Sequence, residues 1–173
     1  MLISALYESK LYDAAKVIRL GVVNDEGVII DDPILKINKF EIVYVGKSEE
    51  YERPTLLHMR KSSESEDCKY FYLHTKGIRH FGTNLEQYVL DWINFMLFWN
   101  IENWRLAIET LNSFHTYGCN DNGDHYSGNF WWAKSSHIQN LPSSIGPLYT
   151  DPEFWIQIVR KNKFCVYSSD LDH

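Results

Sequence analysis

The fold is decided by the stretch YFYLHTKG at residues 70–77. Its first four residues are apolar or aromatic and predict a buried strand, which three polar side chains follow at once. In an open α/β sheet ligands bind beyond the carboxyl ends of the strands, so chemistry is expected at His74, Thr75 and Lys76. Gly77 then permits a close backbone turn. An ammonium fixed at a strand end pairs well with phosphate, and the alternative is a strand that runs into a solvated loop.

The composition is that of a globular chain long enough to bury a sizeable core. Of its 173 residues 45% are hydrophobic and 23% charged, values that argue against long disorder. Aromatic residues make up 15%, with 6 Trp and 11 Tyr, and they supply core area as well as platforms for sugar rings and bases. The net charge of -6 argues against a nucleic-acid binder, which needs a basic face.

The cysteines and the N-terminal residues predict a cytoplasmic protein. Cys68, Cys119 and Cys165 are widely spaced and odd in number, which favours reduced thiols. Residues 1–10 lack the basic start and long apolar run of a signal peptide. The longest apolar run, at 92–99, is too short to span a membrane.

The first seventy residues are expected to alternate strands with helices. We predict strands at 2–7, 28–30 and 40–45, a helix at 13–20 ended by Gly21, and a helix from about Pro54. Followed by the strand at Tyr70, this order is typical of βαβ units and predicts an α/β fold with a mostly parallel sheet.

The second half predicts amphipathic helices and no domain boundary. Apolar residues recur at three- and four-residue steps over 85–99 and 104–114, with Asn103 placed to cap the second helix. A short helix is expected at 135–141, and Asp151 and Pro152 are typical of the start of a further one. Because no linker or repeat divides the chain, residues 1–173 are interpreted as a single domain.

A second unusual stretch lies at residues 125–134, HYSGNFWWAK. The small pair Ser127 and Gly128 before an aromatic run predicts a strand edge that a ligand or another backbone approaches closely. Together, HTKG at 74–77 and SGNFWW at 127–132 resemble short glycosyltransferases with a GT-A-type fold. That family includes proteins of large algal viruses and, more distantly, the rhamnan synthesis F family. The resemblance covers roughly residues 70–155, and the first seventy residues agree only in the order of their elements.

The resemblance implies a nucleotide-sugar donor, such as a UDP-sugar, held by residues 1–80, and a glycan acceptor placed by residues 81–173. In most GT-A enzymes the corresponding strand ends in an Asp-x-Asp motif that holds a divalent metal, whereas this chain has His74, Thr75 and Lys76 there. We expect Lys76, helped by His74, to neutralise the diphosphate without a metal, with Thr75 and Gly77 completing the donor site.

A divalent metal such as manganese is the alternative, because carboxylate oxygens suit such an ion. Its candidate ligands are Asp121 with Asp124, or the terminal group Asp170, Asp172 and His173. Acidic turns and chain ends are also commonly just solvated.

On the acceptor side, the resemblance implies a general base near a helix start that follows the aromatic strand. Glu153, or failing it Asp151, matches that place, although a carboxylate in a first helical turn is also favoured by the helix dipole alone. The remaining candidates are donor contacts at His125, Ser127, Gly128 and Asn129, a base contact at Tyr7, and sugar stacking on Trp131 or Trp132. One of the two tryptophans is expected to point into the core, because neighbours on a strand face opposite ways.

Two other functions compete with the transferase. A binding module of the same fold would hold a nucleotide sugar or carbohydrate without turning it over. A nucleotidyltransferase is disfavoured because the phosphate-cradling glycine loop is missing after the first predicted strand, at residues 7–10.

Overall fold

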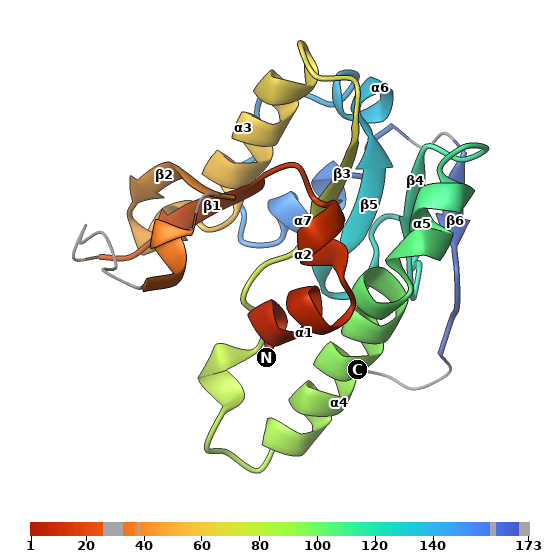
Figure 1. The fold of residues 1–173 in the computed structure, drawn as a ribbon. Coiled ribbons are helices and arrows are strands. Elements are labelled where there is room, and N and C mark those ends of the chain that lie inside the picture. Colours follow the sequence, from red (N-terminus) through yellow and green to blue (C-terminus); the bar gives the residue numbers. More distant parts are fainter. Residues whose placement is uncertain (26–32, 38, 160–161, 170–173) are drawn as a thin grey trace.

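The computed structural model describes residues 1–25, 33–37, 39–159 and 162–169 (Figure 1). The helices are α1 Leu2–Glu8, α2 Leu11–Ala14, α3 Arg53–Ser63, α4 Glu86–Leu97, α5 Trp104–Thr110, α6 Ser135–Ile138 and α7 Asp151–Trp155. The strands are β1 Ile18–Val23, β2 Phe40–Gly46, β3 Lys69–Tyr72, β4 Thr116–Gly118, β5 Trp131–Lys134 and β6 Lys163–Cys165. The chain is therefore of mixed α/β class.

The strands form two sheets. β1 and β2 make a two-stranded parallel sheet, and the other strands make a central sheet of order β3-β5-β4-β6. Within the central sheet β5 runs antiparallel to both neighbours, and only the β4–β6 pair is parallel. The prediction of a mostly parallel sheet is thus wrong for the central sheet. The chain turns back after β4 through an antiparallel bridge between Asp121 and Tyr126, and such a direct return makes an antiparallel pair.

Both faces of the central sheet are covered by helices (Figure 1). On one face Trp132 packs with α1, α2, α4 and α5, and Phe71 stacks on its ring at 4.8 Å between centroids. On the other face Trp131 packs with α3, α6 and α7, and Tyr72 stacks on it at 5.2 Å. Because β3 from the first half pairs with β5 from the second, both predicted halves contribute to the central sheet and to the hydrophobic cluster on each of its faces.

The N-terminal elements differ from their prediction. Residues 2–7 form helix α1, because Leu2, Ala5 and Leu6 have helical spacing and reach the core beside the turn at Phe98–Glu102. The predicted helix at 13–20 is a single turn, α2, followed by strand β1, whose β-branched residues favour extended backbone. The predicted strand at 28–30 lies outside the described residues.

Gly21 lies inside β1 and does not end a helix. The register between β1 and β2 shifts at this glycine, and a Cβ there would overlap the Thr55 hydroxyl of α3. The missing side chain thus lets α3 approach the strand.

The remaining predicted elements are confirmed, with adjusted ends. β2, β3, α3, α4, α5, β5, α6 and α7 lie where the sequence places them. After α4 a π-helical turn, Phe98–Glu102, leads into α5, and the Asn103 side chain donates to the Phe98 carbonyl at 2.9 Å in place of the expected cap bond. In the described part of the chain the helices are too short or too polar to cross a membrane.

Candidate active site

The turn after β3 sets the position of the polar side chains. Gly77 has φ 67, which favours glycine, and a Cβ at this position would overlap Val89 of α4. The turn therefore packs closely against α4. Thr75 is exposed and Lys76 points inward, where it meets residues from the second half of the chain.

Lys76 and Glu153, separated by 77 positions, form an ion pair with Nζ 3.2 Å from Oε1. Their side chains are only 15% and 20% exposed. The Lys76 ammonium also lies 4.8 Å from the ring centroid of Trp92, on α4. The structure thus brings together the predicted diphosphate ligand and the predicted general base.

A second carboxylate, Glu52, lies beside this pair and was missed by the sequence reasoning. Its Oε1 is 3.3 Å from His74 Nδ1, and its Oε2 accepts hydrogen bonds from the Tyr72 hydroxyl at 3.1 Å and from Asn129 Nδ2. Glu52 is the residue before α3. The one sequence signal for Glu52 was its position directly before Arg53 and Pro54, at the expected start of a helix. An acidic residue there is usually explained by its favourable interaction with the helix dipole.

His74 is held by protein groups on both ring nitrogens. Nε2 lies 3.0 Å from the Gly128 carbonyl, and Nδ1 faces Glu52. Burial lowers the pKa of His74, while Glu52 and the Gly128 carbonyl oppose that shift. Because both nitrogens are engaged, His74 orients Glu52 and the 127–129 turn. The sequence predicted that His74 also helps to bind the diphosphate, and its ring borders the same hollow as Lys76.

These groups lie on the wall of a hollow of about 2020 Å³. The hollow runs between the β1–β2 sheet, the helices α1 and α2, and the end of β3. Near the ion pair its lining includes Tyr51, Glu52, Trp92, Tyr149 and Thr150. The two carboxylates, the lysine and the histidine therefore face one shared space.

The 127–129 turn holds several side chains of the site through hydrogen bonds. Ser127 Oγ accepts from Trp92 Nε1 at 2.8 Å, and Asn129 Oδ1 accepts from Trp131 Nε1 at 2.7 Å. Gly128 has φ 66, and a Cβ on it would overlap Met96. The close neighbour of Gly128 is thus the Met96 side chain of α4, where the sequence predicted a ligand or another backbone. All three residues are buried, so they hold other site residues and do not line the hollow as donor contacts.

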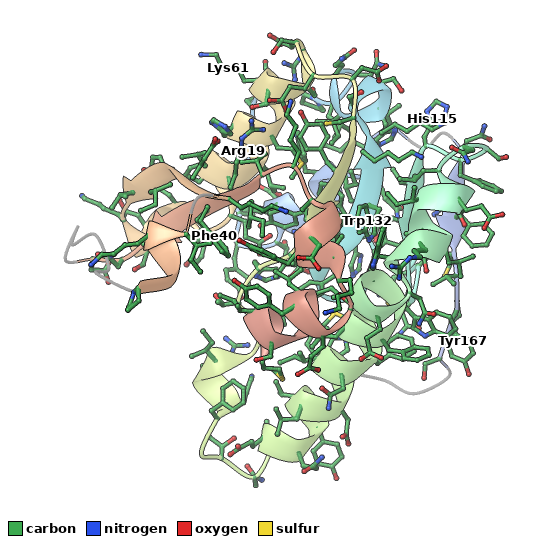
Figure 2. The ribbon with its side chains drawn as sticks, in the orientation of Figure 1. Arg19, Phe40, Lys61, His115, Trp132 and Tyr167 are labelled. Carbon is green, nitrogen blue, oxygen red and sulfur yellow. The ribbon has the colours of Figure 1, made fainter. Side chains whose placement is uncertain are left out.

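Neither Trp131 nor Trp132 is free to stack on a sugar. They point to opposite faces, as predicted, but both faces are covered and the rings are 0% and 4% exposed. Trp132 Nε1 donates to the Asn100 carbonyl at 2.8 Å, and its place between the sheet and the helices can be followed in Figure 2. In the described structure neither ring is open to a sugar, although Trp132 is among the residues that border the hollow, so sugar stacking stays a prediction.

Three further candidates lie apart from the ion pair. Tyr7 is on helix α1, packed on Tyr12 at 4.4 Å between centroids, so the strand end that suggested a base contact does not exist. His125 Nδ1 bonds Asp124 at 2.7 Å, and its ring lies against Phe154. Asp151 accepts from the Leu148 backbone N–H at 2.7 Å. Asp151 thus fixes a loop, which leaves Glu153 as the base candidate.

The acidic turn proposed as a metal site holds an internal cation. Lys163 Nζ lies 2.7 Å from Asp121 Oδ2 and 3.1 Å from both the Gly123 carbonyl and Gln157 Oε1. An ammonium in this oxygen cage takes the place that a metal would need. The other proposed set, Asp170, Asp172 and His173, lies outside the described residues.

Comparison with known protein families, with curated proteins and with solved structures gave no match to this chain. The functional argument therefore depends on the motifs and on the geometry around Lys76.

Proposed function

We propose that this protein is a glycosyltransferase that moves a sugar from a nucleotide-sugar donor, such as a UDP-sugar, to a hydroxyl of a glycan acceptor. The observation that carries the proposal is the Lys76–Glu153 pair on the wall of a large hollow. Small-molecule sites commonly measure about 300–1,000 Å³, so a hollow of about 2020 Å³ has room for donor and acceptor together.

Lys76 would bind the diphosphate of the donor. An ammonium has three N–H donors, and Glu153 is its one hydrogen-bond partner among the described residues. A diphosphate carries more negative charge than a carboxylate and competes for the same cation. When the donor binds, Lys76 exchanges Glu153 for the diphosphate, and Glu153 becomes available.

Glu153 would then act as the general base. The acceptor oxygen attacks the anomeric carbon and gives its proton to the Glu153 carboxylate. The bond between the sugar and the diphosphate breaks, and its electrons go to the diphosphate oxygen that Lys76 stabilises. Negative charge thus moves from the Glu153 carboxylate to the diphosphate, whose added charge the Lys76 ammonium stabilises.

The residues at the end of β3 do not fit the divalent metal of other GT-A enzymes. An ammonium and an imidazole engaged at both nitrogens stand where two carboxylates would be needed, and the nearby carboxylates already pair with Lys76 and His74. We therefore propose a reaction in which Lys76 supplies the positive charge. Full activity in a strong chelator is the expected result; complete loss that manganese restores would contradict it.

Thermal unfolding with nucleoside diphosphates and their sugars tests the donor site. A ligand at a hundred times its dissociation constant adds about 2.7 kcal/mol to the free energy of unfolding, which is readily measured. We expect one nucleotide series to stabilise the wild-type protein and to lose this effect in Lys76→Met. The matched control is Lys163→Met, which removes a caged lysine and should keep the nucleotide-dependent shift.

Release of the nucleoside diphosphate from the stabilising nucleotide sugar separates an enzyme from a binding module. The transferase is expected to release diphosphate slowly to water and faster with an acceptor, in both cases much more than Lys76→Met. Stabilisation without release would identify a binding module, and stabilisation that survives in Lys76→Met would refute the site.

A further inference from the structure

The loop before α7 is fixed from two sides. Arg53 of α3 donates from Nε to the Gly146 carbonyl at 2.8 Å and from Nη2 to the Leu148 carbonyl. Asp151 accepts from the Leu148 N–H, and a Cβ on Gly146 would overlap the Asp151 carboxylate. The loop is thus anchored to both α3 and α7.

This anchored loop presents a largely exposed aromatic ring. Tyr149 is 60% exposed although its backbone neighbours are fixed. Its ring meets Tyr51 edge to face, with centroids 5.1 Å apart and planes at 85°. Both tyrosines line the hollow that contains Lys76 and Glu153.

Tyr51 is held in a costly backbone conformation. It has φ 48 and ψ -130, a region that non-glycine residues rarely occupy, and its ring is 42% exposed. The next residue, Glu52, turns inward to His74, and Arg53 places its guanidinium 5.7 Å from the Tyr51 ring centroid. Backbone strain of this kind persists where the surroundings enforce it, and it gathers at ligand sites.

We propose that Tyr51 and Tyr149 form an aromatic platform that binds the pyranose ring of the acceptor sugar. The proposal rests on the transferase function above and names the acceptor-binding part of the same site. Tyrosine suits this ligand, because its ring packs on the apolar C–H face of a sugar while its hydroxyl reaches the polar edge.

The position of the platform favours an acceptor sugar over a donor base. The Glu153 backbone N–H donates to the Thr150 carbonyl at 2.9 Å, so Tyr149 and the proposed general base Glu153 lie on one short segment. A ligand on Tyr149 would therefore lie on the segment that carries the proposed proton acceptor and in the same hollow, whereas the donor diphosphate goes to Lys76.

Saturation-transfer NMR tests the platform without knowledge of the donor sugar. The probes are methyl glycosides of glucose, galactose, mannose, rhamnose and xylose, titrated with UDP present. At least one is expected to bind the wild-type protein, and Tyr149→Ala should weaken it by about three- to ten-fold. Tyr149→Phe keeps the ring and should keep most of the binding. Leu148→Ala, on the same exposed loop but outside the hollow lining, is the matched control.

The outcomes separate the platform from the transferase proposal. Unchanged glycoside binding in Tyr149→Ala, or no glycoside bound by the wild-type protein, overturns the platform. Loss of nucleotide stabilisation in Tyr149→Ala with glycoside binding intact overturns it too, in favour of a stacked base. In a further outcome, glycoside binding depends on Tyr149 but nucleotide stabilisation is unchanged in Lys76→Met. That result refutes the donor site and supports the platform.

Discussion

Two lysines of this protein each pair with a carboxylate, yet their surroundings give them different roles. Lys163 has Asp121, the Gly123 carbonyl and Gln157 within 3.1 Å, so oxygen atoms use its three N–H donors. Lys76 has Glu153 at 3.2 Å and the Trp92 ring, and it borders the hollow. A saturated lysine stabilises the fold, whereas a lysine with N–H groups to spare beside a cavity can bind an anion.

The largest expected effect is the loss of turnover when Glu153, the partner of Lys76, is replaced. Glu153→Gln keeps the size of the side chain and its hydrogen bond to Lys76 but removes the proton acceptor, so turnover should fall by about 10²–10⁴-fold. Nucleotide stabilisation should be retained. The measurement is acceptor-dependent release of the nucleoside diphosphate, with the exposed Glu109→Gln of α5 as control. Wild-type turnover in Glu153→Gln would remove this residue from catalysis.

The position of Lys76 depends on the tight turn at Gly77, whereas Lys163 lies within strand β6. Gly77→Ala adds a Cβ that overlaps Val89 to a residue with φ 67, and should lower the free energy of unfolding by about 1–3 kcal/mol. Gly82 has φ 77 and open space around it, so Gly82→Ala measures the backbone cost alone. Urea unfolding of both variants gives the difference, and equal losses would show that contact with α4 is unimportant.

Removing the caged lysine should affect stability and leave the donor site intact. Lys163→Met leaves the Asp121 carboxylate without its cation, and we expect a loss of about 1–2 kcal/mol because the pair is only partly buried. Asp121→Asn in the same chain should recover part of that loss, since neither charge is then left alone. Thermal unfolding measures both, with the exposed Lys61→Met as control. Loss of nucleotide-dependent stabilisation in Lys163→Met, as expected for Lys76→Met, would erase the distinction between the two lysines.

The smallest effect concerns an ion pair near the surface. Arg19 of β1 binds Glu66 at 2.7 Å and 3.0 Å, and Tyr70 of β3 donates to the same carboxylate at 2.8 Å. These bonds lower the pKa of Glu66 from 4.5 to about 2. The depressed pKa means that the contribution is present above pH 4.5 and is lost as the pH falls toward about 2.

The difference in urea midpoint between the wild-type protein and Glu66→Gln should therefore shrink as the pH falls through that range. A difference that stays constant would show that the carboxylate charge does not link β1 to β3.

Local patterns were enough for most elements of the central fold. Each of these signals lies within the element that it predicts. Examples are the aromatic run of β3, the periodic apolar residues of α4 and Asp151 at the start of α7. The N-terminal residues misled because a short apolar run such as LISALY fits a buried strand or a helix equally well. Its packing against α2 and the π-helical turn Phe98–Glu102 decided for the helix.

By itself the sequence determined the chemical content of the site: a lysine and a histidine directly after a buried strand, and a carboxylate at a helix start. Only the tertiary structure decided the partners of these groups. It joined Lys76 to Glu153 and His74 to Glu52, and it covered Trp131 and Trp132 with helices. The physical reason is range: a strand or turn is encoded by adjacent residues, whereas an ion pair across 77 positions depends on how sheets and helices pack.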